Sequence, residues 1–381
     1  MNPFFDLAEL TDDPLALTYR ECMLDPNPNK VNLCVGIYAD DEWKPFVFES
    51  IKKAAKEVDI TNNDYYIVQW NALFLQNTGK LIFSENFDSE KYAMQQVCGG
   101  AHAISIFSQL LKKQWRKVVY LGLPTWTNHQ GIFEDFELRT FEHLDRNAVN
   151  LEAYKKAFEE APEYATFIIH VWPTHNPTGV NITASQICEW ADLINKKNIC
   201  LLLDAAYMWF GNGLEADLEE IRIFDRHIHN YTLAFSHSKN ASLYKQKVGA
   251  LYMKTPNKKA IESHIRRIVH RSISNPPGFG VEIMSIVHAK YQREWKEELE
   301  SVRLNLQKRR EMLANILPER FSFIREGKGL FSILWLSELE VEKLKNQYGI
   351  YMPKSSRISF WGLKNSDTHY VWEAISKLKN L

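Results

Sequence analysis

The chain has 381 residues, of which 45% are hydrophobic, and 46 basic residues nearly balance 47 acidic ones. The formal net charge of −1 supplies no general positive field, which argues against a nucleic-acid-binding protein. No apolar segment approaches the roughly 20 residues that a membrane span needs, and residues 1–10 lack the basic start of a secretory signal. Five scattered cysteines are typical of reduced thiols. We therefore expect a cytoplasmic α/β enzyme of about two domains.

The first 30 residues differ in composition from the rest of the chain. They are rich in proline, asparagine and aspartate and end in a DPNPN segment at 25–29. Residues of these types favour turns and irregular structure over regular core elements. We expect an arm or loop here rather than a packed helix or strand.

Between about residues 90 and 280, short apolar segments alternate with segments of helical periodicity. Nearly every residue of the apolar segments is hydrophobic, which is typical of strands buried on both faces. The predicted strands lie at 118–121, 166–171, 199–203, 232–235 and 248–252. Apolar residues at helical spacing predict helices at 101–114 and 183–196. The fold class is therefore α/β, with a mostly parallel sheet sandwiched by helices.

A long amphipathic helix is predicted over residues 293–317, with Pro318 at its end. About 25 helical residues would extend roughly 37 Å, enough to connect two domains. Apolar segments at 321–324, 330–334 and 357–360 are predicted strands, and helices are predicted near 337–347 and at the end of the chain. We expect this α+β tail to join the N-terminal residues in a smaller domain. The predicted division is 1–35 for the arm and part of the small domain, 36–290 for a large domain, and 291–381 for the rest of the small domain.

Two ionisable residues follow buried strands, where ligands of open parallel sheets bind. Asp204 ends the 199–203 segment, and a buried carboxylate is costly unless it meets a cation or a metal. Lys239 lies in the SHSKN segment at 236–240, where a lysine is suited to a lowered pKa and to imine formation. A helix cap or a loop ion pair explains Asp204 about equally well, and most loop lysines are simply solvated.

The CGGAHA segment at 98–103 precedes a predicted helix. Its glycines would let backbone amides approach an anion at the helix N-terminus, where the helix dipole favours negative charge. Taken alone, an ordinary helix-entry turn explains the segment better. No G-x-G-x-x-G or phosphate-loop motif occurs, so the motifs indicate neither a nicotinamide site nor a P-loop.

Two more strand ends carry groups that suit a flat ligand. The HNPTG segment at 175–179 forms a tight turn that would aim the Asn176 amide at a ligand. After the 118–121 strand, Trp126 would stack on a ring and His129 would orient Asp204. The ordinary alternatives are a strand-to-helix turn, a core tryptophan and a surface histidine.

Together these groups make a phosphate cup, an aromatic platform, a buried acid and an imine-forming lysine. Pyridoxal phosphate needs this set, because it takes a lysine for the Schiff base and an aspartate on the pyridinium nitrogen. It also needs a pocket for a dianion and an aromatic ring that stacks on it. We therefore expect pyridoxal 5'-phosphate as the cofactor, and no metal site.

With these residues the chain resembles the aspartate/aromatic amino acid aminotransferases, which are class I aminotransferases and fold-type-I pyridoxal-phosphate enzymes. The resemblance is collinear over nearly the whole length, from VNLCVGIY at 31–38 to Arg357. The strongest matching segments are HNPTG at 175–179, DAAY at 204–207, SHSKN at 236–240, LY at 243–244 with VGA at 248–250, and SNPP at 274–277. The resemblance implies a large domain that binds the cofactor and a homodimer with shared active sites.

The resemblance also implies roles for individual residues. Lys239 would hold the cofactor and move a proton, and Asp204 would keep the pyridine nitrogen protonated. Arg357 would clamp the substrate α-carboxylate with its planar fork. The other implied contacts are Tyr207 and Asn176 at the ring oxygen; Trp126 over the ring; Gly100, Ala101, Ser236, Ser238 and Lys247 at the phosphate; Tyr65 at the phosphate from across the dimer interface; and Gly36, Asn176 and Trp126 near the substrate.

Several positions depart from the family pattern. Lys247 stands where an arginine usually binds the phosphate, and Ala101 replaces a threonine donor. His270 stands where an arginine from the partner subunit binds the side-chain carboxylate of aspartate or glutamate, and Arg271 is the next residue. Either Arg271 takes over by a local shift, or the enzyme prefers aromatic or other neutral side chains. Trp70 adds apolar bulk, and we favour the aromatic donor.

We therefore expect a two-step transamination between an aromatic L-amino acid, with a dicarboxylic one as second candidate, and a 2-oxo acid such as 2-oxoglutarate. An aspartate aminotransferase proper is the first alternative, and a β-lyase or decarboxylase of the same fold is the second. An aminotransferase-like ligand-binding or regulatory protein would need an added DNA-binding segment or the loss of Lys239, and neither is seen. The last alternative is an α/β enzyme without a cofactor.

Overall fold

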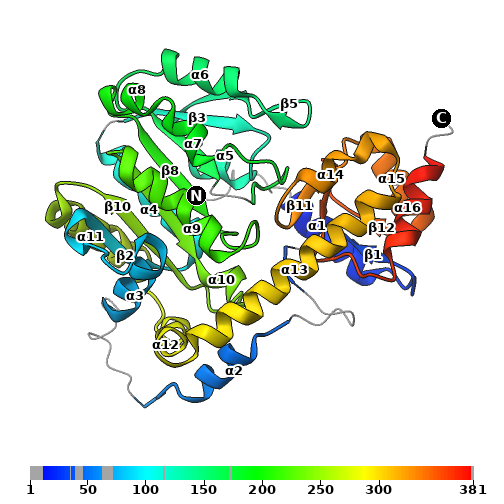
Figure 1. Ribbon diagram of the computed structural model, residues 1–381, viewed down its shortest axis with the longest axis horizontal. Coiled ribbons are helices and arrows are strands. Elements are labelled where there is room, and N and C mark those ends of the chain that lie inside the picture. Colours follow the sequence, from blue (N-terminus) through cyan, green and yellow to red (C-terminus); the bar gives the residue numbers. More distant parts are fainter. Residues whose placement is uncertain are drawn as a thin grey trace, which may run out of the picture.

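The computed structural model describes residues 12–34, 36–38, 46–61, 72–114, 116–170 and 174–378. Seven strands form its main sheet (Figure 1). In sheet order they are β2 (Tyr92–Val97), β10 (Gly249–Lys254), β9 (Tyr231–Ser236), β8 (Cys200–Ala205), β7 (Thr166–His170), β3 (Val118–Leu123) and β4 (Glu137–Glu142). All run in one direction except β10, which is antiparallel to both neighbours. The predicted mostly parallel sheet is confirmed.

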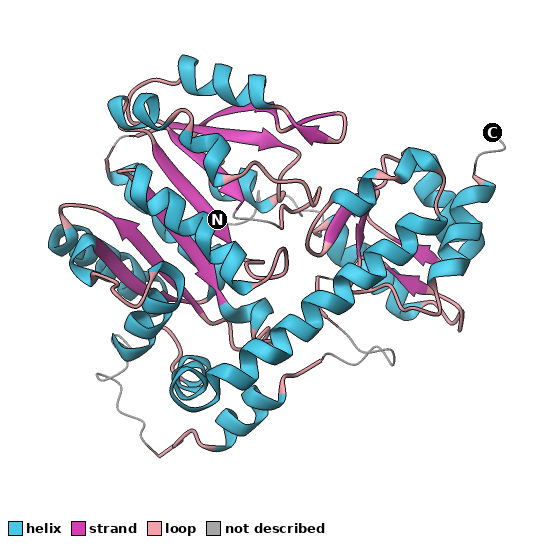
Figure 2. Cartoon of the chain, viewed as in Figure 1, coloured by secondary structure: helices cyan, strands magenta, loops and turns pink. Residues whose placement is uncertain are grey.

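Helices cover both faces of this sheet, so its central strands are buried on both sides (Figure 2). In β8, Leu202 packs into one apolar cluster, whereas Leu201 and Leu203 pack into the other. The first face is covered by α4 (Gly99–Lys113), α5 (Asn128–Ile132) and α11 (Lys258–Ile273). The second face is covered by α3 (Ala72–Phe83), α6 (Leu151–Glu160), α7 (Ala184–Cys188), α8 (Ala191–Lys196) and α9 (Leu214–His227). Burial on both faces explains the continuous apolar segments.

The helix predicted over 183–196 is divided into α7 and α8. Between them the backbone tightens, and the Trp190 amide donates to the carbonyl of Ile187, three residues back. Trp190 then packs against Phe158 of α6, with ring centroids 5.5 Å apart. An aromatic contact between two helices, which no sequence periodicity reveals, thus accompanies the break.

The C-terminal elements gather with the N-terminal ones at one end of the long helix α13 (Figure 1). Strand β1 (Val31–Asn32) pairs in parallel with β12 (Ile350–Tyr351). The others here are α1 (Pro14–Leu24), α14 (Phe323–Glu326), β11 (Phe331–Ile333), α15 (Glu338–Tyr348), β13 (Arg357–Ser359) and α16 (Thr368–Lys377). At the other end of α13 (Gln292–Ile316) lie α2 (Glu49–Lys56) and α12 (Phe279–Ile286). The domain boundaries at 35 and 290 stay predictions.

Two local expectations were wrong. Residues 14–24 form a helix rather than an irregular arm, because Pro14 occupies a first helical position and the Asp13 side chain accepts the Leu15 amide. The segment 321–324 is helical rather than extended, since Phe321 and Ile324, three residues apart, are both buried. No described helix is both long and apolar enough to cross a membrane.

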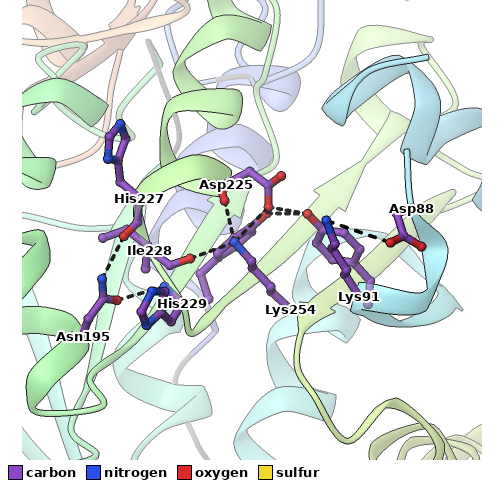
Figure 3. Close-up of polar contacts among 10 residues, drawn as sticks. Asp88, Lys91, Asn195, Asp225, His227, Ile228, His229 and Lys254 are labelled. Carbon is purple, nitrogen blue, oxygen red and sulfur yellow. Dashed lines mark hydrogen bonds and ion pairs between the residues drawn. The ribbon is translucent and has the colours of Figure 1, made fainter. Parts of the chain in front are cut away.

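The end of the sheet where β9 begins is fixed by polar contacts around α9 (Figure 3). Lys254 Nζ donates to the carbonyl oxygens of Asp225 and Ile228, which end α9, and lies 3.3 Å from the Asp225 carboxylate. Asn195 bridges the same turn, donating to the carbonyl of His227. A lysine at a helix C-terminus meets the orphan carbonyls and the negative end of the helix dipole. The candidate site lies at the opposite ends of these strands.

Candidate active site

One cavity of about 200 Å³ lies beyond the carboxyl ends of β8 and β9. Residues from strand ends, turns and the N-terminus of α4 line it, as the strand-end rule predicts. The expected site residues that line it are Gly100, Ala101, Trp126, Asn176, Asp204, Tyr207, Ser236, Ser238, Lys239 and Lys247. The structure thus brings together ten of the expected residues, which lie up to about 150 positions apart in the sequence.

Asp204 is held by a buried chain of hydrogen bonds. Its Oδ2 accepts from His129 Nε2 at 3.1 Å, and its Oδ1 accepts from the Ala206 amide at 3.0 Å. The Thr125 hydroxyl lies 2.9 Å from His129 Nδ1 and 2.9 Å from His170 Nε2, so it joins the two rings. Burial raises the pKa of Asp204, but the hydrogen bond and charge of His129, with smaller effects of His170 and Ala206, lower it to about 2. Asp204 is therefore an anion at neutral pH.

Lys239 lies in α10 (His237–Asn240), the short helix that follows β9. Its Nζ lies 5.0 Å from the centre of the Tyr207 ring. Burial lowers the pKa of Lys239, and the Asp204 carboxylate opposes this shift in part. The amine therefore gives up its proton more readily than an ordinary lysine does. Burial also raises the pKa of Tyr207 to about 12, so its hydroxyl keeps a proton to donate.

The N-terminus of α4 forms a cradle for an anion. Gly99 has φ of +77°, and a Cβ there would lie 3.4 Å from Ser238 Oγ and 3.6 Å from Ser236 Oγ. Ser238 Oγ is buried and has no hydrogen-bond partner among the described residues. Lys247 adds a positive charge on the same cavity. An unsatisfied hydroxyl, a helix N-terminus and a cation fit the phosphate of pyridoxal phosphate.

Arg357 lies beside this cavity and is 8% exposed. Its NH1 donates to Asn176 Oδ1 at 3.2 Å, and its NH2 donates to the Cys34 carbonyl at 2.8 Å. Its buried Nε has no partner in the described part of the chain. A Cβ on Gly36 would lie 3.1 Å from the Tyr207 hydroxyl, so any larger residue at 36 would crowd the site. The guanidinium is thus held in place with donor capacity left over.

Among the expected site residues that the structure describes, four do not line this cavity: Gly36 and Arg357, which lie beside it, and His270 and Arg271. His270 and Arg271 end α11 and are both exposed on the single chain. They do not line the cavity that holds Lys239. Tyr65, and with it Trp70, lies outside the described residues.

A stack of buried histidines supports the turn that carries Asn176, and sequence reasoning missed it. The rings of His143 and His175 lie 4.0 Å apart at 11°, and His175 Nδ1 is 2.9 Å from the Thr178 hydroxyl. Sequence reasoning also missed His170, although it ends β7 directly beside Asp204 in the sheet. The strand-end rule that selected Asp204 would have selected His170 as well.

Comparison with known proteins agrees with this arrangement. Residues 28–375 match the family described as "Aminotransferase class I and II". The tyrosine aminotransferase of Rhizobium meliloti is 30% identical over 96% of this chain and 97% of its own length. The aspartate aminotransferase of Haemophilus influenzae is 31% identical over 96% and 97%. An aromatic-amino-acid aminotransferase of Burkholderia pseudomallei, solved covalently bound to pyridoxal phosphate, matches with a TM-score of 0.91 and 26% identity over 99% of this chain and 100% of that one.

Proposed function

Because the chain belongs to the aminotransferase class I and II family, we propose that it uses pyridoxal phosphate to move the amino group of an aromatic L-amino acid to a 2-oxo acid such as 2-oxoglutarate. The observation that carries the proposal is that Lys239 and Asp204 line one small cavity. This pair supplies an amine that condenses with an aldehyde and an acid that pairs with a pyridinium nitrogen. Both are protein groups that this cofactor requires.

The residues of the cavity fit the cofactor's phosphate and ring. When bound, pyridoxal phosphate supplies an electron sink for the charge that develops at the substrate Cα. The first turn of α4 and the unpaired Ser238 hydroxyl would hold the phosphate, with Lys247 neutralising its charge. Lys247 lacks the fork of an arginine, so it contributes charge rather than fixed geometry. Asp204, already ionised, would accept a hydrogen bond from the ring nitrogen.

Lys239 and Arg357 would act directly on the substrate. The lowered pKa of Lys239 increases the fraction of neutral amine, which can take the proton from the substrate Cα. Arg357 binds the α-carboxylate, and its hydrogen bonds to Asn176 and the Cys34 carbonyl fix the plane of the fork beforehand. A fixed carboxylate holds the Cα near the lysine that removes its proton.

His270, in the last turn of α11, supports the choice of an aromatic amino donor. An imidazole at 270 lacks the planar fork with which an arginine makes a bidentate pair to a side-chain carboxylate. This favours an aromatic donor over aspartate. Arg271 is exposed at the same helix end, and its guanidinium makes aspartate the second candidate.

The site would be completed in a homodimer. On one chain, His270 and Arg271 are exposed and away from the cavity, so they reach a substrate only from another protomer. In this arrangement the partner's His270 reads the donor side chain, and the partner's Tyr65 contacts the phosphate. The cytoplasmic location expected from the cysteines and the N-terminus stays a prediction.

A panel of amino donors tests the proposal. Purified protein with pyridoxal phosphate is assayed with Tyr, Phe, Trp, Asp and Glu, against 2-oxoglutarate and oxaloacetate. The expected result is highest kcat/KM for an aromatic donor, with stoichiometric formation of its oxo acid. Aspartate turned over as fast as the best aromatic donor would contradict the aromatic preference. Release of carbon dioxide, or of a β-substituent, without amino transfer would favour the decarboxylase or β-lyase alternative.

A further inference from the structure

A second cavity, of about 540 Å³, shares no residue with the cofactor cavity. Its lining comes from α3, α9, the π-helical turn Val287–Tyr291 and the start of α13. A single π-helical turn within a longer helix inserts an extra residue and frequently marks a functional site. The turn here joins α12 to α13 and places His288 on the cavity wall.

His288 is the buried polar group of this cavity. The residue is 9% exposed, and neither ring nitrogen has a hydrogen-bond partner in the described part of the chain. Buried polar groups in folded proteins are nearly always hydrogen-bonded, so an imidazole left without partners calls for one. Burial, with the charge of Lys296, lowers the pKa of His288 to about 4, so the neutral ring carries one N–H donor.

Arg222 adds a second unsatisfied donor. Its Nε is buried without a partner among the described residues, and the residue lines the same cavity. Its NH1 lies 3.8 Å from Glu215 Oε2 and 4.0 Å from Glu219 Oε2, both beyond hydrogen-bond distance. The arginine therefore keeps donor capacity for an oxygen-rich ligand.

The basic and acidic residues that line the cavity differ in exposure. Lys80 and Lys296 are half-buried in its wall, and neither makes an ion pair with a described residue. The acidic lining residues Glu85 and Glu215 are exposed, so water screens their charge. The lining therefore holds three basic side chains, Lys80, Arg222 and Lys296, that are less exposed than its two acidic ones.

We propose that this cavity is a second binding site, for a small oxyanion such as a phosphate or carboxylate group. Lys80, Lys296 and Arg222 supply the positive charge, and His288 with Arg222 Nε supplies the donors that lack acceptors. An oxyanion accepts several hydrogen bonds at once and carries a negative charge, so it pairs with these basic side chains better than a single water does.

The site adjoins the segment that carries Lys239. The ring of His288 lies 5.5 Å from that of His237, with its centre also 5.9 Å from Trp295. His237 begins α10, and its Nδ1 lies 2.9 Å from Asn240 Oδ1 at the other end of that helix. His288 therefore packs against His237, the first residue of the helix that carries Lys239.

Calorimetric titration with inorganic phosphate tests the proposal. The protein is first saturated with pyridoxal phosphate, so that the phosphate cup of the cofactor cavity is filled. We expect saturable binding of one phosphate per chain, weakened about tenfold or more in Lys296→Met and further in Lys80→Met/Lys296→Met. The matched control is Lys155→Met on α6, which removes one exposed positive charge far from the cavity and leaves binding unchanged.

Two further arms distinguish the alternatives. Lys247→Met alters only the cofactor cavity, so phosphate binding lost in Lys247→Met and kept in Lys296→Met would overturn the proposal. Absence of saturable binding to the cofactor-saturated protein would also overturn it. A parallel titration with acetate separates the sources: binding of both anions supports a general oxyanion site, and binding of phosphate alone supports a site for a phosphate group. The titration measures phosphate binding and not turnover, so its result does not depend on which amino donor the enzyme prefers.

Discussion

His129 Nε2 lies 3.1 Å from Asp204 Oδ2, with side-chain exposures of 0% and 5%. A carboxylate can only accept, so the imidazole donates, and its other nitrogen is held by the Thr125 hydroxyl at 2.9 Å. This contact lets a buried strand-end aspartate keep its charge despite desolvation. An ordered anion of this kind would accept the hydrogen bond of a pyridinium nitrogen.

Replacing His129 with leucine should uncouple this pair. We expect the free energy of unfolding at pH 7 to fall by about 1–3 kcal/mol, the cost of leaving a buried polar partner unsatisfied, and kcat to fall at least tenfold. His129→Gln, which keeps a donor near Asp204, should lose less of both. Urea unfolding and steady-state kinetics measure the two effects. Equal losses in the leucine and glutamine variants would show that the donor is not what matters.

The pH dependence of stability should report the same pair. The folded-state pKa of Asp204 is about 2, below its ordinary value of 3.8, so its stabilising effect is complete above 3.8 and is lost as the pH falls towards 2. Wild type should therefore lose its advantage over His129→Leu within this window. A stability difference that stays constant from pH 5 to pH 2 would contradict the assignment.

Lys239→Met should stabilise the cofactor-free protein. Because burial lowers the folded-state pKa below the ordinary 10.5, the fold disfavours the charged amine, and this penalty is complete below the folded-state pKa. The penalty disappears as the pH rises through that pKa towards 10.5. Thermal midpoints should thus favour the methionine variant at pH 7 and converge with wild type near pH 11. Lys155→Met, at an exposed position, should show neither effect.

Ser238→Ala should weaken cofactor binding without destabilising the empty protein. The Ser238 hydroxyl has no partner among the described residues, so its loss breaks no bond of the fold, whereas a bound phosphate would lose one donor. We expect the Kd for pyridoxal phosphate to rise about tenfold by fluorescence titration. The control is Ser108→Ala, where the hydroxyl donates to the Ser105 carbonyl of its own helix and lies away from the cavity. Unchanged affinity in Ser238→Ala would remove this residue from the phosphate cup.

His270→Arg should shift the donor preference towards aspartate. An arginine at 270 adds the bidentate partner that a side-chain carboxylate lacks, so kcat/KM for aspartate should rise about tenfold or more. The value for tyrosine should stay the same or fall. Arg271→Met is the companion variant, because loss of aspartate turnover there would instead assign side-chain recognition to Arg271. The two variants together decide between the aromatic and the aspartate reading of the site.

The sheet and most of the cavity could be predicted because both depend on local patterns. Continuous apolar segments mark strands buried on both faces, and Asp204 and Ser236 lie at the carboxyl ends of two such strands. Parallel strands bring their carboxyl ends together, so residues distant in sequence meet without any further information. The expected contact of His129 with Asp204 belongs to this class, since Asp204 lies at the end of β8 and His129 follows β3, with one strand between them in the sheet.

Features that depend on tertiary contacts could not be predicted. The bridge through Thr125 from His129 to His170 joins two strand ends by one hydroxyl, and no spacing encodes it. The stack of His143 on His175 likewise brings together residues from separate connections. The helix at 14–24 is a different case, because it begins at a local cap, Asp13 before a proline, within a segment whose composition favours turns. In each case the deciding contact is with a residue far away or with a single cap.

The most direct test of the account is to locate the cofactor on the chain. Protein incubated with pyridoxal phosphate is reduced with borohydride, digested, and mapped by mass spectrometry, with Lys239→Ala treated in parallel. We expect one pyridoxyl group per chain, on Lys239, and none on the variant. A label on Lys247 or on any other lysine, or an unlabelled wild-type chain, would contradict it.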